Sequence, residues 1–235
     1  GLANDGEATV NLPWAFPWYG TSYSAVVVGA NGGLAFVGPD VGGANGCLPS
    51  AASAPAIAPF WDDLDPTAIL PFPGLAAGVY AWHDTALGHD RFIVSYEGVP
   101  DAGNIFGLGG TFQAQLYPDG SVEFHYDSLF FFSGADDGAG ATIGIQNVAG
   151  SADLDPLQVS CNAATALEGT GLRFWLCLDA DADGVCADDD CDDNDPDAFP
   201  GAPETCDDGL DQDCDGGDLV GDVDADGVLN PACGG

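Results

Sequence analysis

Aspartates recur at every second position in the last quarter of the chain, a spacing suited to holding a cation through oxygen atoms. An EF-hand-type loop supplies side-chain oxygens from positions 1, 3 and 5, a main-chain carbonyl from position 7 and a carboxylate from position 12, with glycine at position 6. The first loop fits this pattern throughout, with Asp179, Asp181, Asp183, the carbonyl of Val185 and the closing Asp190. Calcium, a hard ion that takes ~6–8 oxygen ligands, is the ion such a loop predicts.

Three further loops follow the same spacing. The second has Asp193, Asp195, Asp197, the carbonyl of Phe199 and the closing Glu204, with Ala198 in place of glycine. The third has Asp211, Asp213, Asp215, the carbonyl of Gly217 and the closing Asp222. The fourth has Asp222, Asp224, Asp226 and the carbonyl of Val228, but Cys233 stands where a carboxylate is needed. The sequence therefore predicts about three to four calcium ions.

Two alternatives compete with calcium loops. A run of acidic residues can be a disordered tail, but this one also holds six of the eight cysteines and glycines at turn positions. Copper is the other alternative, and it is disfavoured because soft and imidazole ligands are scarce here. Aspartate-rich sequence matches the spacing easily by chance, so the three carboxylates at position 12 carry more weight than the alternating aspartates.

The charge of the chain excludes several classes of function. The 38 acidic residues face only two basic ones, Arg91 and Arg173, which gives a net charge of −36. Binding to nucleic acid needs lysine and arginine for phosphate contacts, and we expect none. No apolar run is long enough to span a membrane. Eight cysteines without close zinc-type pairs indicate disulfides and an extracellular or cell-surface location. Because the chain lacks methionine, we read Gly1 as following a removed signal peptide.

The elements that must position these loops divide into two parts. We expect an all-β domain over residues 1–176, an antiparallel β-sandwich or jelly roll, followed by an irregular, loop-rich tail over residues 177–235 that calcium and disulfides stabilise. Short alternating or β-branched runs predict strands at 25–30, 34–37, 78–82, 91–96, 111–117, 122–126, 141–146 and 172–176. Pro118-Asp119-Gly120 predicts a hairpin turn between two of them.

Both parts resemble known families. The first part carries, in order, FPWYG at 16–20, GANGGL at 29–34, IAPFWDDL at 57–64, GVY at 78–80, RFIV at 91–94, FQ at 112–113 and ATIGIQ at 141–146. It resembles a nidogen-like extracellular β-sandwich domain of secreted bacterial surface proteins. The tail carries DCDDNDP at 190–196, PGAPETCD at 200–207 and DCDG at 213–216. It resembles the Asp/Cys metal-binding motif of secreted bacterial proteins and is similar to thrombospondin type 3 calcium repeats. These resemblances imply a structural or adhesive role outside the cell.

Evidence for an enzyme is weak. Asp62, Asp63 and Asp65 could form a carboxylate pair or a cation site, but a solvated turn capped by aspartate is the simpler interpretation. The three histidines show no metalloprotease spacing, and no nucleophile elbow or phosphate loop is present. We therefore expect no catalytic residues. We also expect a Cys47–Cys161 disulfide and, as a local guess in the tail, Cys206–Cys214.

The sequence is compatible with two hypotheses about function. The first is a calcium-stabilised subunit of an extracellular filament or surface assembly that associates head to tail, with residues 8–12 adding a strand to a neighbour. The alternative is an adhesion or glycan- or matrix-binding sandwich with the tail as a rigid spacer. Its binding surface would use exposed aromatic residues such as Trp14, Trp18 or Trp82, although most of these favour the core.

Overall fold

The computed structural model contains two compact units, Gly1–Trp175 and Leu176–Gly235, which are described separately. We call them the sandwich unit and the tail unit. The structure describes residues 1–39, 42–49, 55–68, 77–102, 109–129, 131, 139–147, 157–165, 167–175, 177, 179–187 and 189–221.

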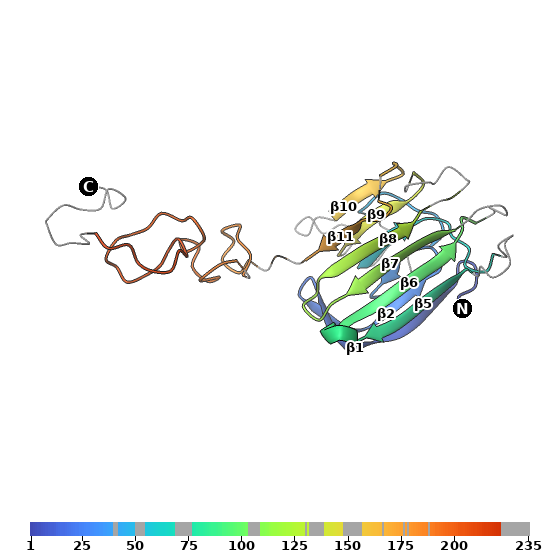
Figure 1. The fold of residues 1–235 in the computed structure, drawn as a ribbon, viewed down its shortest axis with the longest axis horizontal. Helices are drawn as coiled ribbons and strands as arrows, with labels where there is room; N and C mark the ends of the chain where they lie inside the picture. Colours follow the sequence, from blue (N-terminus) through green and yellow to red (C-terminus); the bar gives the residue numbers. More distant parts are fainter. Residues whose placement is uncertain are drawn as a thin grey trace. The chain divides into compact units, whose positions relative to one another are not determined.

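The sandwich unit consists of two antiparallel sheets (Figure 1). The six-stranded sheet has the order β1 (Glu7–Trp18), β2 (Thr21–Gly29), β3 (Leu34–Ala35), β4 (Ala56–Trp61), β9 (Thr142–Gln146) and β10 (Leu157–Cys161). The five-stranded sheet has the order β11 (Gly171–Phe174), β8 (Val122–Ser128), β7 (Gly110–Leu116), β6 (Arg91–Val99) and β5 (Gly78–Asp84). Most neighbours are consecutive strands, so hairpins build each sheet and the chain crosses between sheets only after β4, β8 and β10.

The core lies between the two sheets and is rich in aromatic residues. Phe60 of one sheet packs against Phe112 of the other, with ring centroids 5.3 Å apart. Two buried tyrosine hydroxyls tie the sheets together: Tyr96 donates to the carbonyl of Gly29 at 2.8 Å, and Tyr126 donates to the carbonyl of Pro59 at 2.7 Å. Burial raises the pKa of Tyr126 far above its ordinary value. Tyr126 therefore stays a neutral hydrogen-bond donor.

The expected all-β fold is confirmed, and three strands were missed. β1 contains Pro13 and Pro17, and proline in a sequence favours a loop over a strand. Proline is tolerated here because β1 is an edge strand. β4 is buried at all its positions, so it lacks the alternation that marks a half-buried strand. β10 is short and bulged. Among the described residues, the one helix is the three-residue 3-10 turn Ala86–Gly88, and no helix could cross a membrane.

Residues 8–12 are part of this sheet and are not a free segment. They lie in β1, where Ala8 pairs with Val28 and Val10 pairs with Val26 of β2. The expectation that this segment is donated to a neighbour's sheet is therefore corrected. Because β2 occupies one side of this segment, the described structure leaves only its other side, the outer edge of β1, for pairing with another molecule.

A disulfide joins distant parts of the sandwich unit, as expected. Cys47 bonds to Cys161 at the end of β10, across 114 residues of sequence. The loop carrying Cys47 is also held by Gln158, whose side-chain oxygen accepts from the amide of Leu48 at 2.7 Å. The bond therefore fastens this loop to the edge of the six-stranded sheet.

Candidate metal centre

The first aspartate loop gathers its carboxylates as the spacing requires. Side-chain oxygens of Asp179, Asp181 and Asp183 lie within 4.8 Å of one another. Partial desolvation, followed by the negative charges of Asp183, Asp190 and Asp179, raises the pKa of Asp181. Asp190, at position 12 of the loop, therefore lies close enough to contribute to the same negative site.

Three oxygens in this loop are buried without a partner. They are the Oδ2 atoms of Asp181, Asp183 and Asp190, and no hydrogen bond reaches any of them. Burying a carboxylate oxygen without a hydrogen bond or counter-charge is costly. These are three of the four side-chain ligands predicted for the first loop. A cation would supply the missing interaction.

The third loop also forms a cluster. Glu204, Asp211 and Asp213 bring carboxylate oxygens within 4.8 Å of one another. The charge of Asp213, followed by desolvation and the charges of Asp211 and Glu204, raises the pKa of Asp215, which places Asp215 beside the cluster. Glu204 is fixed there by two main-chain amides, because Oε1 accepts from Asp213 and Oε2 accepts from Leu219.

The first and third loops share one backbone turn. At position 4, Ala182 and Cys214 have φ values of 66° and 60°, and at position 6, Gly184 and Gly216 have φ values of 98° and 117°. In both loops the carboxylate at position 1 accepts from the amide at position 6: Asp179 from Gly184 at 3.0 Å, and Asp211 from Gly216 at 3.1 Å. The repeated turn points the carboxylates inward.

The second loop does not form this turn, and its sequence explains why. Position 4 is Pro196, whose ring fixes φ near −65° and forbids the left-handed conformation that the other two loops use there. Position 6 is Ala198, which adopts positive φ only at a cost that glycine avoids. Asp193 instead accepts from the amide of Ala180 in the first loop at 2.9 Å.

The remaining predicted residues of the second loop have other surroundings. Asp195 accepts from the amide of Asp197 at 3.2 Å, and the carbonyl of Phe199 accepts from Ala202 at 2.8 Å. Glu204, assigned by spacing to the second loop, lies with Asp211 and Asp213 of the third.

The residues at position 7 of the first and third loops also contact their own loops. The main-chain amide of Val185 donates to Asp183, and the main-chain amide of Gly217 donates to Asp215. Asp222, Asp224, Asp226 and Val228 lie outside the described residues.

Disulfides hold the two clusters together. Cys191 bonds to Cys214, and Cys177 bonds to Cys186. The guess of a Cys206–Cys214 pair is therefore wrong, although Cys206 is itself disulfide-bonded. Cys191 follows Asp190 of the first loop, whereas Cys214 stands between Asp213 and Asp215 of the third. A single covalent bond thus links the two carboxylate clusters, a connection that sequence spacing could not reveal.

Asp218 has a structural role that the spacing did not predict. Asp218 accepts from the main-chain amides of Asp207 at 3.0 Å and Gly209 at 2.7 Å, one to each oxygen. It falls at position 8 of the third loop, which has no side-chain role in the EF-hand pattern. The sequence therefore carried no signal for it. Asp218 stabilises the turn that precedes the third loop.

The aspartates after β4 form a capped turn in the sandwich unit. Asp65 accepts from the amide and the hydroxyl of Thr67, and Asp62 accepts from the amide of Asp63 at 2.8 Å. Desolvation, followed by the charges of Asp5 and Asp65, raises the pKa of Asp63. These contacts agree with the simpler interpretation, a turn capped by aspartate.

The ligand atoms of the tail suit a hard cation. The chain has no methionine, and its histidines, at positions 83, 89 and 125, all precede the tail. The described tail cysteines are in disulfides, so none of them offers a thiolate. The two clusters of described residues therefore present carboxylate oxygen, a ligand that suits a hard cation better than it suits copper.

Fold and site together define an extracellular β-domain protein that binds metal. Residues 1–173 match the family model described as NIDO related, and residues 190–218 match the Cu-binding MopE model of a metal-binding motif. The chain belongs to the NIDO-related family. No curated protein and no solved structure matches it.

Proposed function

We propose that the metal of the tail unit is calcium and that this protein is a calcium-stabilised structural component of an extracellular assembly. The observation that carries the calcium assignment is the trio of buried, unpartnered oxygens on Asp181, Asp183 and Asp190. A cation at that position would have several carboxylate ligands and no nitrogen or sulfur ligand. The first and third loops would together hold at least two ions. The role that we propose for the protein is structural and involves no catalysis.

Neutralising Asp190 tests the ion site itself. Asp190→Asn keeps the shape of the side chain but removes one of the buried charges, so we expect calcium affinity at the first site to fall about tenfold or more. The neighbouring Asp189 is exposed and belongs to no cluster of described residues, which makes Asp189→Asn the matched control. Calorimetric titration with calcium and with copper measures both variants. Equal calcium affinities, or tighter binding of copper than of calcium, would contradict the assignment.

Self-association is supported by one open side of the sandwich unit. The edge strands β1 and β5 border an apolar hollow of about 330 Å³, lined by Leu2, Val10, Val28, Val79 and Ala81 among others. Pro13 and Pro17 interrupt the second half of β1, so its proline-free first half and β5 are the edges able to pair. A strand from a neighbouring molecule could add there and cover the hollow.

An assembly test follows from this hollow. Ala81→Asp places a charge against the apolar lining, and Leu87→Asp adds the same charge at a fully solvated site, since Leu87 is 97% exposed. In millimolar calcium we expect the unaltered chain and Leu87→Asp to form oligomers or filaments, and Ala81→Asp to remain monomeric. Sedimentation velocity and electron microscopy measure this. A monomeric unaltered chain would overturn the assembly, oligomers of Ala81→Asp would overturn the interface, and filaments in excess EDTA would overturn the role of calcium.

A further inference from the structure

The outer surface of the five-stranded sheet carries two rows of side chains that cross the strands. Strand register aligns Tyr80, Ser95, Gln113, His125 and Gly171 in the first row. It aligns Trp82, Ile93, Gln115, Glu123 and Arg173 in the second row. We call these two rows the platform. The platform extends over all the strands of the sheet, about 4.8 Å apart, and is long enough for an extended ligand.

Hydrogen bonds orient the polar groups of the platform. Gln113 donates to Ser95 at 3.2 Å, and Gln115 donates to Gln113 at 3.0 Å. Tyr117, beside the second row, donates to Glu123 at 2.9 Å. Ser95 and Gln115 are buried and Gln113 is half-buried, so these bonds hold the amide of Gln113 in place before any ligand arrives, which lowers the entropy cost of binding.

The charges of the platform are paired with one another. Arg91, which lies beside the second row and donates to Gln115, bonds to Asp84 at 2.9 Å, and Arg173 of the second row lies 3.7 Å from Glu123. Arg91 and Arg173 are the only arginine or lysine residues of a chain with a net charge of −36. Both cations are already compensated, so an anionic ligand would be repelled. The partner best suited to the platform is uncharged and rich in hydrogen-bonding groups.

Two aromatic rings are exposed at one end of the platform. Tyr80 is 48% exposed and Trp82 is 40% exposed, although both lie on a strand of the sandwich. The Tyr80 ring lies along the strand over Gly78, where a Cβ atom would be only 2.6 Å from the Tyr80 hydroxyl. The exposed parts of the two rings offer apolar surface to a ligand. Aromatic faces of this kind provide large apolar contact at the surface, beside polar groups.

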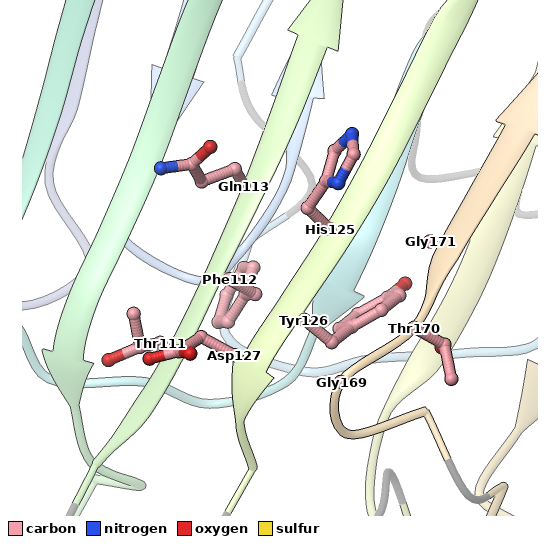
Figure 2. Close-up of a pocket in the computed structure, with 9 residues that line it drawn as sticks. All are labelled: Thr111, Phe112, Gln113, His125, Tyr126, Asp127, Gly169, Thr170 and Gly171. Carbon is pink, nitrogen blue, oxygen red and sulfur yellow. The ribbon is translucent and has the colours of Figure 1, made fainter.

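A hollow of about 430 Å³ lies at the other end, within the size range of small-ligand sites (Figure 2). Its polar lining includes Thr111, Gln113, His125, Asp127 and Thr170. His125 bonds through Nε2 to Glu123 at 3.0 Å. Desolvation opposes the ionisation of Glu123, but hydrogen bonds from His125 and Tyr117 outweigh it and hold the pKa of Glu123 below its ordinary value. Nε2 therefore donates to an ionised carboxylate, and in that tautomer Nδ1 is an acceptor.

Gly171 keeps the space beside this acceptor open. A Cβ atom on Gly171 would lie 3.6 Å from His125 Nδ1, so the missing side chain leaves room for a hydroxyl group to reach that nitrogen. Among the described residues, nothing donates to Nδ1. The two ends of the platform thus offer complementary contacts, an aromatic surface at β5 and a hydrogen-bonding hollow at β8 and β11.

From this arrangement we infer that the platform binds a neutral oligosaccharide lying across the strands. Sugar rings present apolar C–H faces to aromatic rings and hydroxyl groups to amides, carboxylates and imidazole, which is the combination found here. Of the tryptophans first considered for such a surface, Trp18 is buried and Trp14 packs against His83 at 5.4 Å, whereas Trp82 belongs to the platform. The inference does not depend on the calcium sites.

The test screens the chain of residues 1–235 in calcium against neutral hexasaccharides of glucose, mannose, xylose and N-acetylglucosamine, followed by calorimetry with those that bind. We expect at least one to bind, and Trp82→Ala to weaken it about tenfold, with most affinity restored in Trp82→Phe. Gly171→Val occupies the space beside Nδ1, with its Cβ meeting other atoms at 3.4 Å or more, and should also abolish or greatly weaken binding. Gly46→Val, at a site with no atom within 4 Å, is the matched control.

Several results would overturn the platform. The first is that no hexasaccharide binds at millimolar concentration. The second is that Trp82→Ala and Gly171→Val bind as tightly as the unaltered chain, in variants whose melting temperature matches that of the unaltered chain. Binding must also persist in EDTA, because the platform contains no metal cluster of described residues. Loss of binding in EDTA would assign the ligand to the tail unit instead.

Discussion

In excess EDTA the tail unit is expected to unfold while the sandwich unit stays folded. The physical reason is the difference between their interiors. The sandwich unit buries a large aromatic and aliphatic cluster between two sheets, whereas the buried apolar residues described in the tail unit are Ala198 and Ala202. Two alanines contribute little hydrophobic stabilisation. Without a cation, the crowded carboxylates of both clusters repel one another, so calcium binding should supply much of the folding free energy.

The two units can be followed by separate probes. All five tryptophans, at positions 14, 18, 61, 82 and 175, lie in the sandwich unit, so tryptophan fluorescence reports on that unit. Digestion with proteinase K reports on the tail, and mass spectrometry locates the cuts. We expect cleavage within residues 177–221 to accelerate at least tenfold in EDTA, with fluorescence unchanged. A tail equally resistant with and without calcium would contradict the prediction.

Removing the Cys191–Cys214 disulfide is expected to weaken both metal sites together. The bond closes a loop with a sequence separation of 23 residues, and chain entropy alone would make its loss cost about 3 kcal/mol. It also joins the residue after Asp190 to the residue between Asp213 and Asp215, so both clusters lose a fixed neighbour. In the Cys191→Ser/Cys214→Ser variant we expect calcium affinity at both sites to fall, measured by calorimetry and by the calcium dependence of proteolysis.

A second disulfide variant serves as the control. Cys177–Cys186 has a sequence separation of only nine residues and encloses positions 1 to 7 of the first loop, with no residue of the third. Cys177→Ser/Cys186→Ser should therefore weaken the first site and spare the third. If the two double variants lowered affinity at the same single site, or neither changed it, the coupling of the clusters through Cys191–Cys214 would be disproved.

The sequence predicted those parts of the fold that depend on local patterns. Alternation along 111–117 and 122–126, with the turn at 118–120, predicted the β7–β8 hairpin, because the pleat places successive side chains on opposite faces. It missed β4, whose burial on both faces removes alternation, and β1, whose prolines are acceptable only at a sheet edge. Whether a strand lies at the edge or in the centre of a sheet depends on how the whole sheet assembles, so the local sequence pattern of that strand cannot predict it.

The metal loops divide in the same way. Residue type and spacing by themselves determined that the tail is an oxygen-ligand site, and they placed the first loop, because positions 1, 3 and 5 of one short turn are held by local backbone geometry. Pro196 and Ala198 disfavour the left-handed turn in the second loop, so residue type by itself already distinguishes this loop from the first and third. Only the tertiary structure grouped Glu204 with Asp211 and Asp213, and only it paired Cys191 with Cys214. Those contacts join segments that are separated along the chain, so they depend on how the tail folds in three dimensions and not on local spacing.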